Sequence, residues 1–514
     1  MKILFFHRNA ECLGIEYLSS ALQKAGHKVD LIFDPGIGDV EYKFEILNFF
    51  DISNKMIEKA KSYNPDLIAF SCLTNLYPWV SKMASRIKQS MNVPIIVGGM
   101  HPTILPDFVI KNSNIDMICI GEGDEALVEL AESMQNNKMD YSIRNIWFKN
   151  NGNIIRNLPR PLLQDLDSLS FPDKELFKKY GCFSVKFNIM TGRGCPYQCT
   201  YCFNSYYRSL FCGNYIRRRS VQNVIDELYL AKSKYSIGMV SFFDDIFTLN
   251  DEWVKDFCKI YKQKINLPFN ILVHPQIIKE EIIELLGDAG CFYVEMGIES
   301  GNEALRRTIL KRYMSNQDIE RAIKILKKFN IKIATLNMIG FPNETREQMW
   351  ETYELNRKLK PHGTVIAIPY PFPKTEFADY CLQNGFLEEE GHKEICEGRG
   401  GFKEGTLLKN VEIKEAQRLQ VVMPILIKTP VFLHPLIKRL PINSLTRIIS
   451  IFYISITKNA HIRIKESIIM FFKSHYLYLK RSRPYYYLED YPKVPASASR
   501  EASAAPRPSV SGIH

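Results

Sequence analysis

The chain has 514 residues, 46% of them hydrophobic and 24% charged, which allows two or three folded domains and excludes both wholesale disorder and a polytopic membrane protein. Its twelve cysteines are scattered, and its first residues do not resemble a signal peptide, so a reducing, cytoplasmic location is expected. The formal net charge of +11 is concentrated in residues 428–483, where eleven Lys and Arg face one acidic residue.

Short apolar runs alternate with amphipathic segments in the N-terminal part of the chain. Five runs have the length and composition of buried strands: 2–7, 28–33, 66–72, 94–99 and 115–121. Segments such as 15–24 and 125–134 have the periodicity of helices. This alternation predicts a parallel sheet wrapped by helices, so residues 1–140 are expected to form a Rossmann-like α/β domain. Residues 141–182, rich in turn-forming residues and prolines, are expected to be a linker.

A second α/β series occupies residues 183–400. Six candidate strands are each separated by enough chain for a helix: 184–189, 239–243, 270–273, 293–296, 333–338 and 365–369. Six such units predict a partial (β/α)6 barrel, with its ligand site at the C-terminal ends of the strands. Tyr313, Glu295 and His274 are expected near that pocket from their positions in the series.

The composition changes in the last part of the chain. Residues 401–494 are expected to be helical, apolar and basic, and residues 495–514 to be a disordered tail rich in Ala, Ser and Pro. Within 420–483 no apolar run reaches the roughly 20 residues needed to span a bilayer. Two interpretations stay open: helices that contact the inner membrane surface or an anionic, lipid-like substrate, and a helical cap with a solvated basic face. Nucleic acid is not expected as a partner, because no aromatic-rich recognition module accompanies the charge.

The sequence TGRGCPYQCTYCFN places Cys195, Cys199 and Cys202 in a CxxxCxxC array just after the first expected barrel strand. Three thiolates at this spacing can hold a 4Fe-4S cluster and leave its fourth iron without a protein ligand. One alternative is a zinc site, which normally closes with four ligands, and here Cys212 or Cys182 could supply the fourth. Another is a non-enzymatic iron-sulfur electron carrier.

This motif, at the opening of a barrel of this kind, resembles that of the radical SAM superfamily. The resemblance implies that S-adenosylmethionine (SAM) chelates the open iron and that one electron from the cluster cleaves it to a 5'-deoxyadenosyl radical. It implies an external electron donor of the flavodoxin or ferredoxin type. It also implies that Tyr201 and Phe203, which bracket the last cysteine, set an aromatic ring against the SAM adenine.

Three further segments match the same family in the right order, each at an expected strand end. SFFDDIF offers Asp244 and Asp245 where related enzymes contact the SAM amino group, although those enzymes often have Gly-Gly-Glu there. MGIESG offers Glu299 and Ser300 to the ribose hydroxyls. MIGFP offers Gly340, at which the backbone can approach the cofactor closely.

Three N-terminal segments, SCLT, GGMHPT and GEGDEAL, also stand at expected strand ends. They resemble the cobalamin-binding domain that precedes many radical SAM cores, including methyltransferases and the anaerobic magnesium-protoporphyrin cyclase type. Glycines there let the backbone approach a large flat ligand, and hydroxyls and helix N-termini can bond to its amides or phosphate. The residues implied in cobalamin binding are Ser71, Leu73, Thr74, Gly98, Gly99, His101, Gly121, Glu122 and Gly123.

The stretch RNAECLG at 8–14 lacks the His of the DxHxxG motif, which ligates cobalt in methionine-synthase-like domains. Radical SAM relatives commonly lack it too. His101 lies in a glycine-rich loop and is expected to pack or to bond the ligand periphery rather than to bind cobalt. The alternative is a domain that holds no cofactor and is kept for architecture.

The resemblance covers residues 1–380 and implies a cobalamin-dependent radical SAM enzyme. The leading interpretation is methylation of an unactivated carbon in a small-molecule or lipid-like substrate, with one SAM methylating cobalamin and a second generating the radical. The alternative keeps both cofactors but performs a radical cyclisation or oxidative rearrangement without methyl transfer. The cofactors carry the chemistry in either case, so the protein positions them and excludes water and oxygen. The sequence names no catalytic residue.

Overall fold

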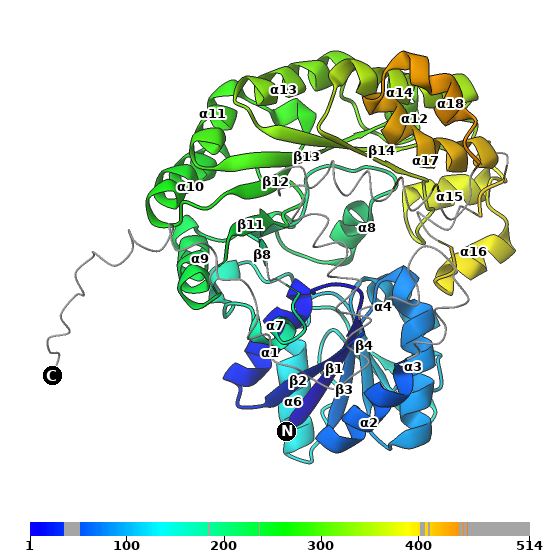
Figure 1. Cartoon of the computed structure of the whole chain (residues 1–514). Coiled ribbons are helices and arrows are strands. Elements are labelled where there is room, and N and C mark those ends of the chain that lie inside the picture. Colours follow the sequence, from blue (N-terminus) through cyan, green and yellow to red (C-terminus); the bar gives the residue numbers. More distant parts are fainter. Residues whose placement is uncertain are drawn as a thin grey trace, which may run out of the picture. The chain divides into compact units, whose positions relative to one another are not determined.

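The computed structural model of the chain describes residues 1–34, 52–182, 186–235, 237–400, 407–409 and 412–441, together with Thr446 and Ser450. That part of the chain contains a seven-stranded sheet, a six-stranded sheet and a two-stranded ribbon. Figure 1 shows the two larger sheets with their helices. The predicted α/β fold class is confirmed, whereas the expected tail at 495–514 lies outside the described residues.

The N-terminal sheet has the strand order β2-β1-β3-β4-β5-β6-β7. Its strands are β1 (Lys2–Arg8), β2 (Lys28–Asp34), β3 (Leu67–Ser71), β4 (Ile95–Gly98), β5 (Met117–Cys119), β6 (Ile146–Asn150) and β7 (Asn153–Arg156). The first five pair in parallel, as the Rossmann-like prediction requires. Adjacent residues of one strand, such as Phe5 and Phe6, enter cores on opposite faces, which explains the continuous apolar runs.

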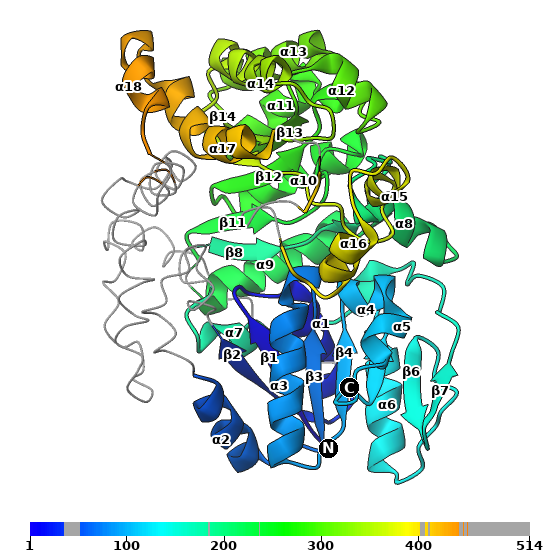
Figure 2. The ribbon, with the colours of Figure 1, turned by 90° about the vertical axis from the view of Figure 1, so that its right-hand side faces the viewer.

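Helices cover both faces of this sheet (Figure 2). They are α1 (Leu13–Lys24), α2 (Ser53–Tyr63), α3 (Tyr77–Ser90), α4 (Met100–Ile104), α5 (Pro106–Ile110), α6 (Ala126–Gln135) and α7 (Glu175–Lys178). On one face α1 and α6 contribute Leu22 and Leu130 to the core that contains Phe5. On the other face α2 and α3 contribute Ile57 and Met83.

Strands β6 and β7 form a hairpin inside the segment that was expected to be a linker. β6 pairs with β5 in an antiparallel direction, and its Ile146 and Phe148 are buried in the core that α1 and α6 cover. The turn residues Asn151 and Gly152 both have positive φ, 49° and 80°, which two-residue hairpins favour. Residues 146–156 therefore belong to the sheet rather than to a linker, because their alternate apolar side chains have a core to enter.

The second sheet has six parallel strands in the order β15-β14-β13-β12-β11-β8. They are β8 (Lys186–Ile189), β11 (Met239–Phe242), β12 (Phe269–Val273), β13 (Cys291–Glu299), β14 (Lys332–Met338) and β15 (Gly363–Ala367). Each overlaps a predicted strand, so the partial (β/α)6 barrel is confirmed.

Six helices pack outside the barrel strands (Figure 1). They are α9 (Val221–Tyr235), α10 (Asp251–Lys264), α11 (Glu280–Asp288), α12 (Glu303–Thr308), α13 (Asn316–Lys328) and α14 (Arg346–Leu359). Alternate residues of β13, such as Val294 and Met296, share one core with Ile283 of α11 and Leu326 of α13. Capping boxes begin α13 and α14, so both helices start at defined positions after their strands.

Smaller elements complete the described fold. They are the ribbon of β9 (Gly192–Arg193) and β10 (Arg217–Arg218), and helices α8 (Phe203–Leu210), α15 (Glu376–Gln383), α16 (Glu389–Cys396), α17 (Ile413–Lys428) and α18 (His434–Lys438). α17 packs against α14 through Leu419 and Tyr353, so the described part of 401–494 is helical, as expected. None of the described helices combines the length and apolarity that crossing a bilayer requires.

Candidate functional site

The cysteine loop runs from the β9 ribbon to the start of α8, beyond the C-terminal end of β8. Its central residue Thr200 is fixed on both sides. The Thr200 hydroxyl donates to the Ile309 carbonyl at 2.6 Å, and the Phe377 N–H donates to the Thr200 carbonyl at 2.9 Å. Within the loop, the Cys202 N–H donates to the Cys199 carbonyl at 3.0 Å. The loop that carries the three cysteines is therefore anchored to the barrel at its middle.

A buried guanidinium, which the sequence did not reveal, lies against the cysteine loop. Arg312 Nη1 donates to Cys199 Sγ at 3.4 Å, and its Nη2 donates to the Gly297 carbonyl at 2.8 Å. Burial by itself would lower the pKa of Arg312, but Tyr201, Glu299 and Cys199 hold it above its ordinary value. The group is thus a permanent cation beside a sulfur that has to carry negative charge as a metal ligand.

Glu299, at the end of β13, faces the same cation. Its carboxylate lies 3.8 Å from Arg312 Nη1 and is hydrogen-bonded to the side chain of Tyr201. Glu299 has a φ of +71°, a strained value for a residue with a side chain, at an irregularity in the pairing of β13 with β14. A Cβ on Gly297 would lie 2.4 Å from Glu299 Oε1, so a side chain at 297 would displace this carboxylate. Burial raises the pKa of Glu299.

Two other predicted SAM residues are engaged inside the protein. Asp244 is buried and accepts hydrogen bonds from the Thr191 hydroxyl at 2.7 Å and from the Thr191 N–H. Ser300 is fully buried, and its hydroxyl accepts the Asn302 N–H at 3.2 Å before α12. Both side chains are therefore bonded to residues at the strand ends and do not present a free polar group to SAM.

By contrast, Asp245 is exposed, and it bonds to Asn204 of α8. The thiol of Cys195 lies within the electrostatic reach of this carboxylate. Asp245 is thus the member of the SFFDDIF segment that is oriented towards the cysteine loop.

Gly340, which was also predicted to approach SAM, follows β14. Its N–H donates to the Glu344 carboxylate at 2.5 Å, and its φ is +89°.

Aromatic rings line the loop on two sides. Tyr197 stacks on His274, which follows β12, with ring centroids 3.9 Å apart. Phe203 packs on Phe372 at 4.8 Å. Burial, followed by the charge of Arg312, lowers the pKa of His274 to about 3, so its imidazole is neutral at physiological pH. Of the other predicted pocket residues, Tyr313 is 62% exposed and Glu295 lies half-buried on β13.

A zinc site does not fit this geometry. Among the residues that the structure describes, no three His, Cys, Asp or Glu side chains converge as the ligands of a single metal ion do. The suggested fourth ligands are an exposed Cys212 and a half-buried Cys182. A mononuclear zinc ion needs four donors around one centre, whereas an iron-sulfur cluster distributes its thiolates over several irons. The three-cysteine loop with its adjacent cation fits the cluster better.

The three N-terminal segments lie together at the C-terminal ends of β3, β4 and β5, and hydrogen bonds join them. The His101 N–H donates to the Cys72 carbonyl at 3.0 Å. The Thr103 hydroxyl donates to the Gly99 carbonyl at 2.8 Å and accepts the Gly121 N–H at 2.9 Å. A Cβ on Gly99 would lie 2.9 Å from the backbone of Cys72. The segments are therefore closely packed against one another.

Side chains of these segments differ in exposure. Leu73 is 54% exposed and Ser71 is half-buried, whereas Thr74 and His101 are buried and hydrogen-bonded to each other at 3.3 Å. The His101 ring packs against Tyr77 with centroids 4.7 Å apart. Burial lowers the pKa of His101 to about 3, so the ring is neutral. Gly98 and Gly123 make contacts with Cys119, where a Cβ would lie 3.5 Å and 3.3 Å from its side chain.

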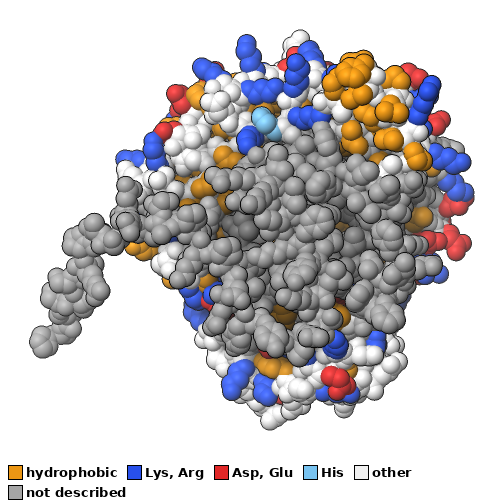
Figure 3. Space-filling view, in the orientation of Figure 1, with side chains coloured by type: hydrophobic (Ala, Val, Ile, Leu, Met, Phe, Trp, Pro, Cys, Tyr) orange, Lys and Arg blue, Asp and Glu red, His pale blue; other side chains and the backbone are white. Residues whose placement is uncertain are grey.

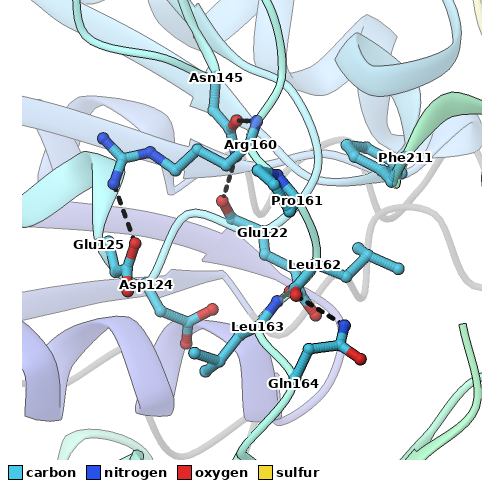
Figure 4. Close-up of a pocket in the computed structure, with 10 residues that line it drawn as sticks. All are labelled: Glu122, Asp124, Glu125, Asn145, Arg160, Pro161, Leu162, Leu163, Gln164 and Phe211. Atoms are coloured by element: carbon cyan, nitrogen blue, oxygen red, sulfur yellow. Dashed lines mark hydrogen bonds and ion pairs between the residues drawn. The ribbon is translucent and has the colours of Figure 1, made fainter. Parts of the chain in front are cut away.

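Glu122 has a different environment from the one expected of a cobalamin-binding residue. Its carboxylate accepts hydrogen bonds from Arg193 at 2.7 Å and from Arg217 at 2.8 Å. It also borders a cavity of about 240 Å³, whose other lining residues are Asp124, Glu125, Asn145, residues 160–164 and Phe211 (Figure 4). This carboxylate is therefore committed to partners within the chain.

Family models match both halves of the described fold. Residues 8–131 match the model of the B12 binding domain, and residues 189–355 match the model of the radical SAM superfamily. The first range contains all three N-terminal segments, and the second contains the cysteine loop. The predicted domain order, and with it the prediction of a 4Fe-4S cluster, SAM and cobalamin as cofactors, is confirmed.

Similar proteins include several methyltransferases. The chain is 31% identical to an uncharacterised methyltransferase of Pyrococcus horikoshii, over 73% of this chain and 79% of that protein. It is 22% identical to cytidylyl-2-hydroxyethylphosphonate methyltransferase of Streptomyces wedmorensis, over 75% and 81%. It is 24% identical to anaerobic magnesium-protoporphyrin IX monomethyl ester cyclase of Cereibacter sphaeroides, over 73% and 63%.

Solved structures share the fold. TsrM from Kitasatospora setae, a radical SAM methyltransferase solved with cobalamin and a 4Fe-4S cluster, aligns with a TM-score of 0.61 at 16% identity, over 76% of each chain. The cobalamin-dependent radical SAM enzyme OxsB aligns with a TM-score of 0.62 at 14% identity, over 93% of this chain and 79% of that one. The two family matches and the 31% identical relative lead to one conclusion. The chain belongs to the radical SAM superfamily, in the group whose radical SAM domain follows a B12-binding domain.

Proposed function

We propose that this chain is a cobalamin-dependent radical SAM methyltransferase that acts on an unactivated carbon of a small molecule. The observation that carries the proposal is the direct ion pair between the two domains, in which Arg193 beside the cysteine loop contacts Glu122 within the third of the predicted cobalamin segments. This contact supports two cofactor sites that act together. The methyltransferase relatives support methyl transfer as the outcome.

The residues around the cysteine loop fit a cluster with one open iron. Cys195, Cys199 and Cys202 would each ligate one iron, and Arg312 would balance the negative charge at Cys199. When bound, the reduced cluster supplies the electron that cleaves SAM, and cobalamin carries the methyl group. An external donor of the flavodoxin or ferredoxin type would deliver that electron.

Five residues would bind SAM: Tyr201, Phe203, Asp245, Glu299 and Gly340. Arg312 is close enough to Glu299 to fix the orientation of its carboxylate. Asp244 and Ser300 would support the SAM site without contacting SAM, because each is buried and stabilises a strand end through a hydrogen bond. The neutral imidazole of His274 stacks on Tyr197 and keeps that side of the loop apolar.

Cobalamin would lie over the N-terminal segments. The exposed apolar side chain of Leu73 would contact the flat ligand, while Gly99 and Gly121 allow close packing of the loops beneath it, because a Cβ on either would meet Cys72 or Phe211. Ser71 and Thr74 offer hydroxyls, and His101 supports Thr74 from a buried position. Gly98 and Gly123 would allow the close packing of these loops on Cys119.

Product analysis under anaerobic conditions tests the proposal. The reconstituted chain is incubated with reductant, cobalamin and SAM labelled with deuterium in its methyl group, together with an extract of small molecules. We expect S-adenosylhomocysteine, 5'-deoxyadenosine and a deuterated methyl product, and none of them from Cys199→Ala. Formation of 5'-deoxyadenosine without S-adenosylhomocysteine would rule out methyl transfer and favour radical cyclisation, which the cyclase relatives suggest as the second function.

An exposed apolar surface suggests where the chain contacts its substrate. Val431, Phe432 and Leu436 are 64%, 78% and 66% exposed, next to the basic residues Lys438 and Arg439. Figure 3 shows hydrophobic side chains gathered in the region of α17 and α18. An apolar tip with a basic rim suits the surface of an anionic bilayer. We therefore propose peripheral contact with the inner membrane surface and a lipid-like substrate.

Flotation with lipid vesicles tests this contact. We expect the chain to float with vesicles that contain anionic lipid and less with purely zwitterionic ones. Replacing both Phe432 and Leu436 by Ser should weaken binding by roughly 100-fold or more, since each buried apolar side chain contributes about 1.5–3 kcal/mol. Leu158→Ser removes an equally exposed apolar residue, 74% exposed, from the N-terminal part and should have no effect. Equal flotation of all variants would refute the contact.

A further inference from the structure

Both oxygens of the Glu122 carboxylate are occupied by groups of the chain itself. Arg193 Nη1 donates to Oε1 at 2.7 Å, and Arg217 Nη1 donates to Oε1 at 2.8 Å and to Oε2 at 3.0 Å. The Leu163 N–H donates to Oε2 at 3.0 Å, a bond visible in Figure 4. Although burial opposes it, the two arginines hold the pKa of Glu122 below its ordinary value. The carboxylate is ionised at neutral pH and has little capacity left for a ligand.

The arginines connect this carboxylate to the cysteine loop. Arg193 lies in β9, two residues before Cys195, and its Cα pairs with that of Arg217 across the ribbon. Gly194, between Arg193 and Cys195, has a φ of +96°, and a Cβ there would lie 2.3 Å from the Tyr215 carbonyl. The step from the arginine to the first cysteine therefore has a single tight conformation. A shift of Glu122 relative to the barrel would be transmitted to Cys195.

The helix that follows the cysteine loop, α8, lies at its far end against Gly121, the residue before Glu122. α8 begins directly after Cys202, and Phe211 follows its last residue. A Cβ on Gly121 would lie 2.5 Å from the Phe211 ring, which also packs on Tyr207 of α8 at 4.7 Å. Two consecutive residues of the N-terminal domain thus contact the ribbon that precedes the loop and the end of the helix that follows it. This contact requires glycine at 121 for space and a carboxylate at 122 for charge.

Glu122 is also tied to the segments proposed to bind cobalamin. Its neighbour Gly121 donates its N–H to Thr103, which in turn donates to the Gly99 carbonyl. The Asn145 side chain donates to the Glu122 carbonyl at 2.7 Å, as Figure 4 shows. A continuous hydrogen-bonded path therefore joins the glycine-rich loop after β4 to the cysteine loop of the barrel.

We infer that Glu122 is a positioning residue that sets the distance and orientation between the cluster and cobalamin, and that it does not bind cobalamin itself. This inference rests on the proposed function, because only an enzyme that uses both cofactors on one substrate needs them held at a fixed distance and orientation. A reaction in which a radical formed at one cofactor and a methyl group carried by the other must both reach the same substrate carbon depends on angstrom-level placement, and a 1 Å error can lower a rate roughly 100-fold. Loosening the contact should therefore uncouple the two half-reactions without removing either cofactor.

Two variants separate this role from general stability. Glu122→Gln keeps the shape and removes the charge, which leaves the buried Arg217 without its carboxylate and Arg193 with Asp124 alone, 3.4 Å away. Arg193→Lys keeps a charge but loses the forked geometry, and it is the milder change if the first variant fails to fold. Asp107→Asn is the matched control, since it removes a carboxylate of α5 that is paired with Arg156, and among the described residues no contact joins this pair to the loop or the three segments.

The first measurement needs no cofactor. Hydrogen-deuterium exchange on the chain alone should show faster exchange at residues 119–126 and 190–202 in Glu122→Gln and Arg193→Lys, and no change there in Asp107→Asn. The second measurement uses the reconstituted enzyme. Iron and cobalamin content should match those of the unmodified chain, while the ratio of methylated product to 5'-deoxyadenosine should fall roughly tenfold or more.

The outcomes are distinguishable. Unchanged exchange in both segments would overturn the contact as a positioning device, whatever the chemistry. Faster exchange with an unchanged product ratio would overturn the role of this contact in positioning the two cofactors relative to each other. Loss of cobalamin from Glu122→Gln, with iron retained, would overturn the statement that this carboxylate is not a cobalamin ligand. If the unmodified chain forms no methylated product, the proposed function fails, and the exchange result still decides the contact.

Discussion

Arg312 lies 113 positions from Cys199 in the sequence, yet its guanidinium donates a hydrogen bond to the sulfur of that cysteine. It follows α12 in a turn where Lys311 has a φ of +51°, and no motif marks it. The same side chain holds the Gly297 carbonyl and faces Glu299. One cation therefore organises a cluster ligand and a predicted SAM ligand together.

Replacing Arg312 by Lys tests this arrangement. A lysine keeps the charge but cannot reach Cys199 and Gly297 at once, because it lacks the planar fork. We expect the chain to retain its iron but to form 5'-deoxyadenosine roughly 10-fold more slowly, as positioning is lost. The exposed neighbour Arg307→Lys should leave both iron content and rate unchanged. Equal rates for the two variants would show that the contact has no role.

Glu344 is a buried carboxyl group with an unusual balance of partners. Its Oε2 accepts the N–H groups of Gly340 and Phe341 at 2.5 Å and 3.0 Å, whereas its Oε1 has no hydrogen-bond partner among the described residues. Burial, with a smaller contribution from Glu351, raises the pKa of Glu344 from 4.5 to about 7. The folded chain therefore holds a proton here that the unfolded chain releases between these two values.

This shift predicts a pH dependence of stability. The pKa of Glu344 is higher in the folded state, so its contribution is fully present below about pH 4.5 and is lost as pH rises through about 7. Glu344→Gln should be less sensitive over this range and more stable than the unmodified chain at pH 8, by about 3 kcal/mol. Urea unfolding at pH 5 and pH 8 measures the difference. Glu354→Gln, at an exposed position on the helix α14 that follows Glu344, should behave like the unmodified chain at both pH values.

At the scale of elements, loops at the C-terminal ends of strands carry the candidate sites. Gly99 and Gly26 both have positive φ, +99° and +84°, but a Cβ on Gly99 would meet the Cys72 backbone at 2.9 Å, whereas nothing lies within 4 Å of one on Gly26. The two glycines share the same conformational reason for being glycine. They differ only in the space around them.

Alanine at each position separates the two effects. Gly26→Ala should cost about 1–2 kcal/mol, the penalty of a side chain in a left-handed conformation. Gly99→Ala should cost at least about 2 kcal/mol more, since backbone atoms of two packed segments would have to move apart. Free energies of unfolding from denaturant titration give the comparison. Similar values for both variants would mean that the β3 and β4 loops separate easily, contrary to the packing described above.

At the scale of the whole molecule, one buried lysine joins the two domains. Lys174 Nζ donates to Glu11 and Glu16 of the N-terminal domain, each at 2.7 Å, and to the Asn188 carbonyl of β8 at 2.8 Å. Its side chain is 2% exposed, and those of the two carboxylates are 3% and 0% exposed. The segment after the β6-β7 hairpin thus carries a structural contact rather than acting as a passive connection.

Lys174→Met should therefore destabilise the chain by about 3–5 kcal/mol, because it leaves two buried carboxylates without a cation. Lys179→Met removes a partly exposed partner of Asp30 and should cost no more than about 1 kcal/mol. Urea unfolding followed by intrinsic fluorescence measures both. A loss of less than 1 kcal/mol in Lys174→Met would show that the domains are held together by other contacts.

The sequence by itself determined the fold class, the order of the domains and the positions of the barrel strands, because these depend on local periodicity and on motifs of contiguous residues. Cys195, Cys199 and Cys202 are recognisable for the same reason, since their spacing lies within one loop. The hairpin around Asn151 and Gly152 was also marked locally by its turn residues, although its place in the sheet was not.

Only the tertiary structure decided which polar groups meet. Arg312 reaches Cys199 across 113 positions, and Arg193 reaches Glu122 across 71, and no spacing rule connects residues so far apart. The same holds for Asp244 and Ser300, whose burial depends on neighbours brought in by other strands. Side chains of one chemical type can bind a cofactor or neutralise a distant charge, and what decides between these roles is the set of atoms that folding places around them.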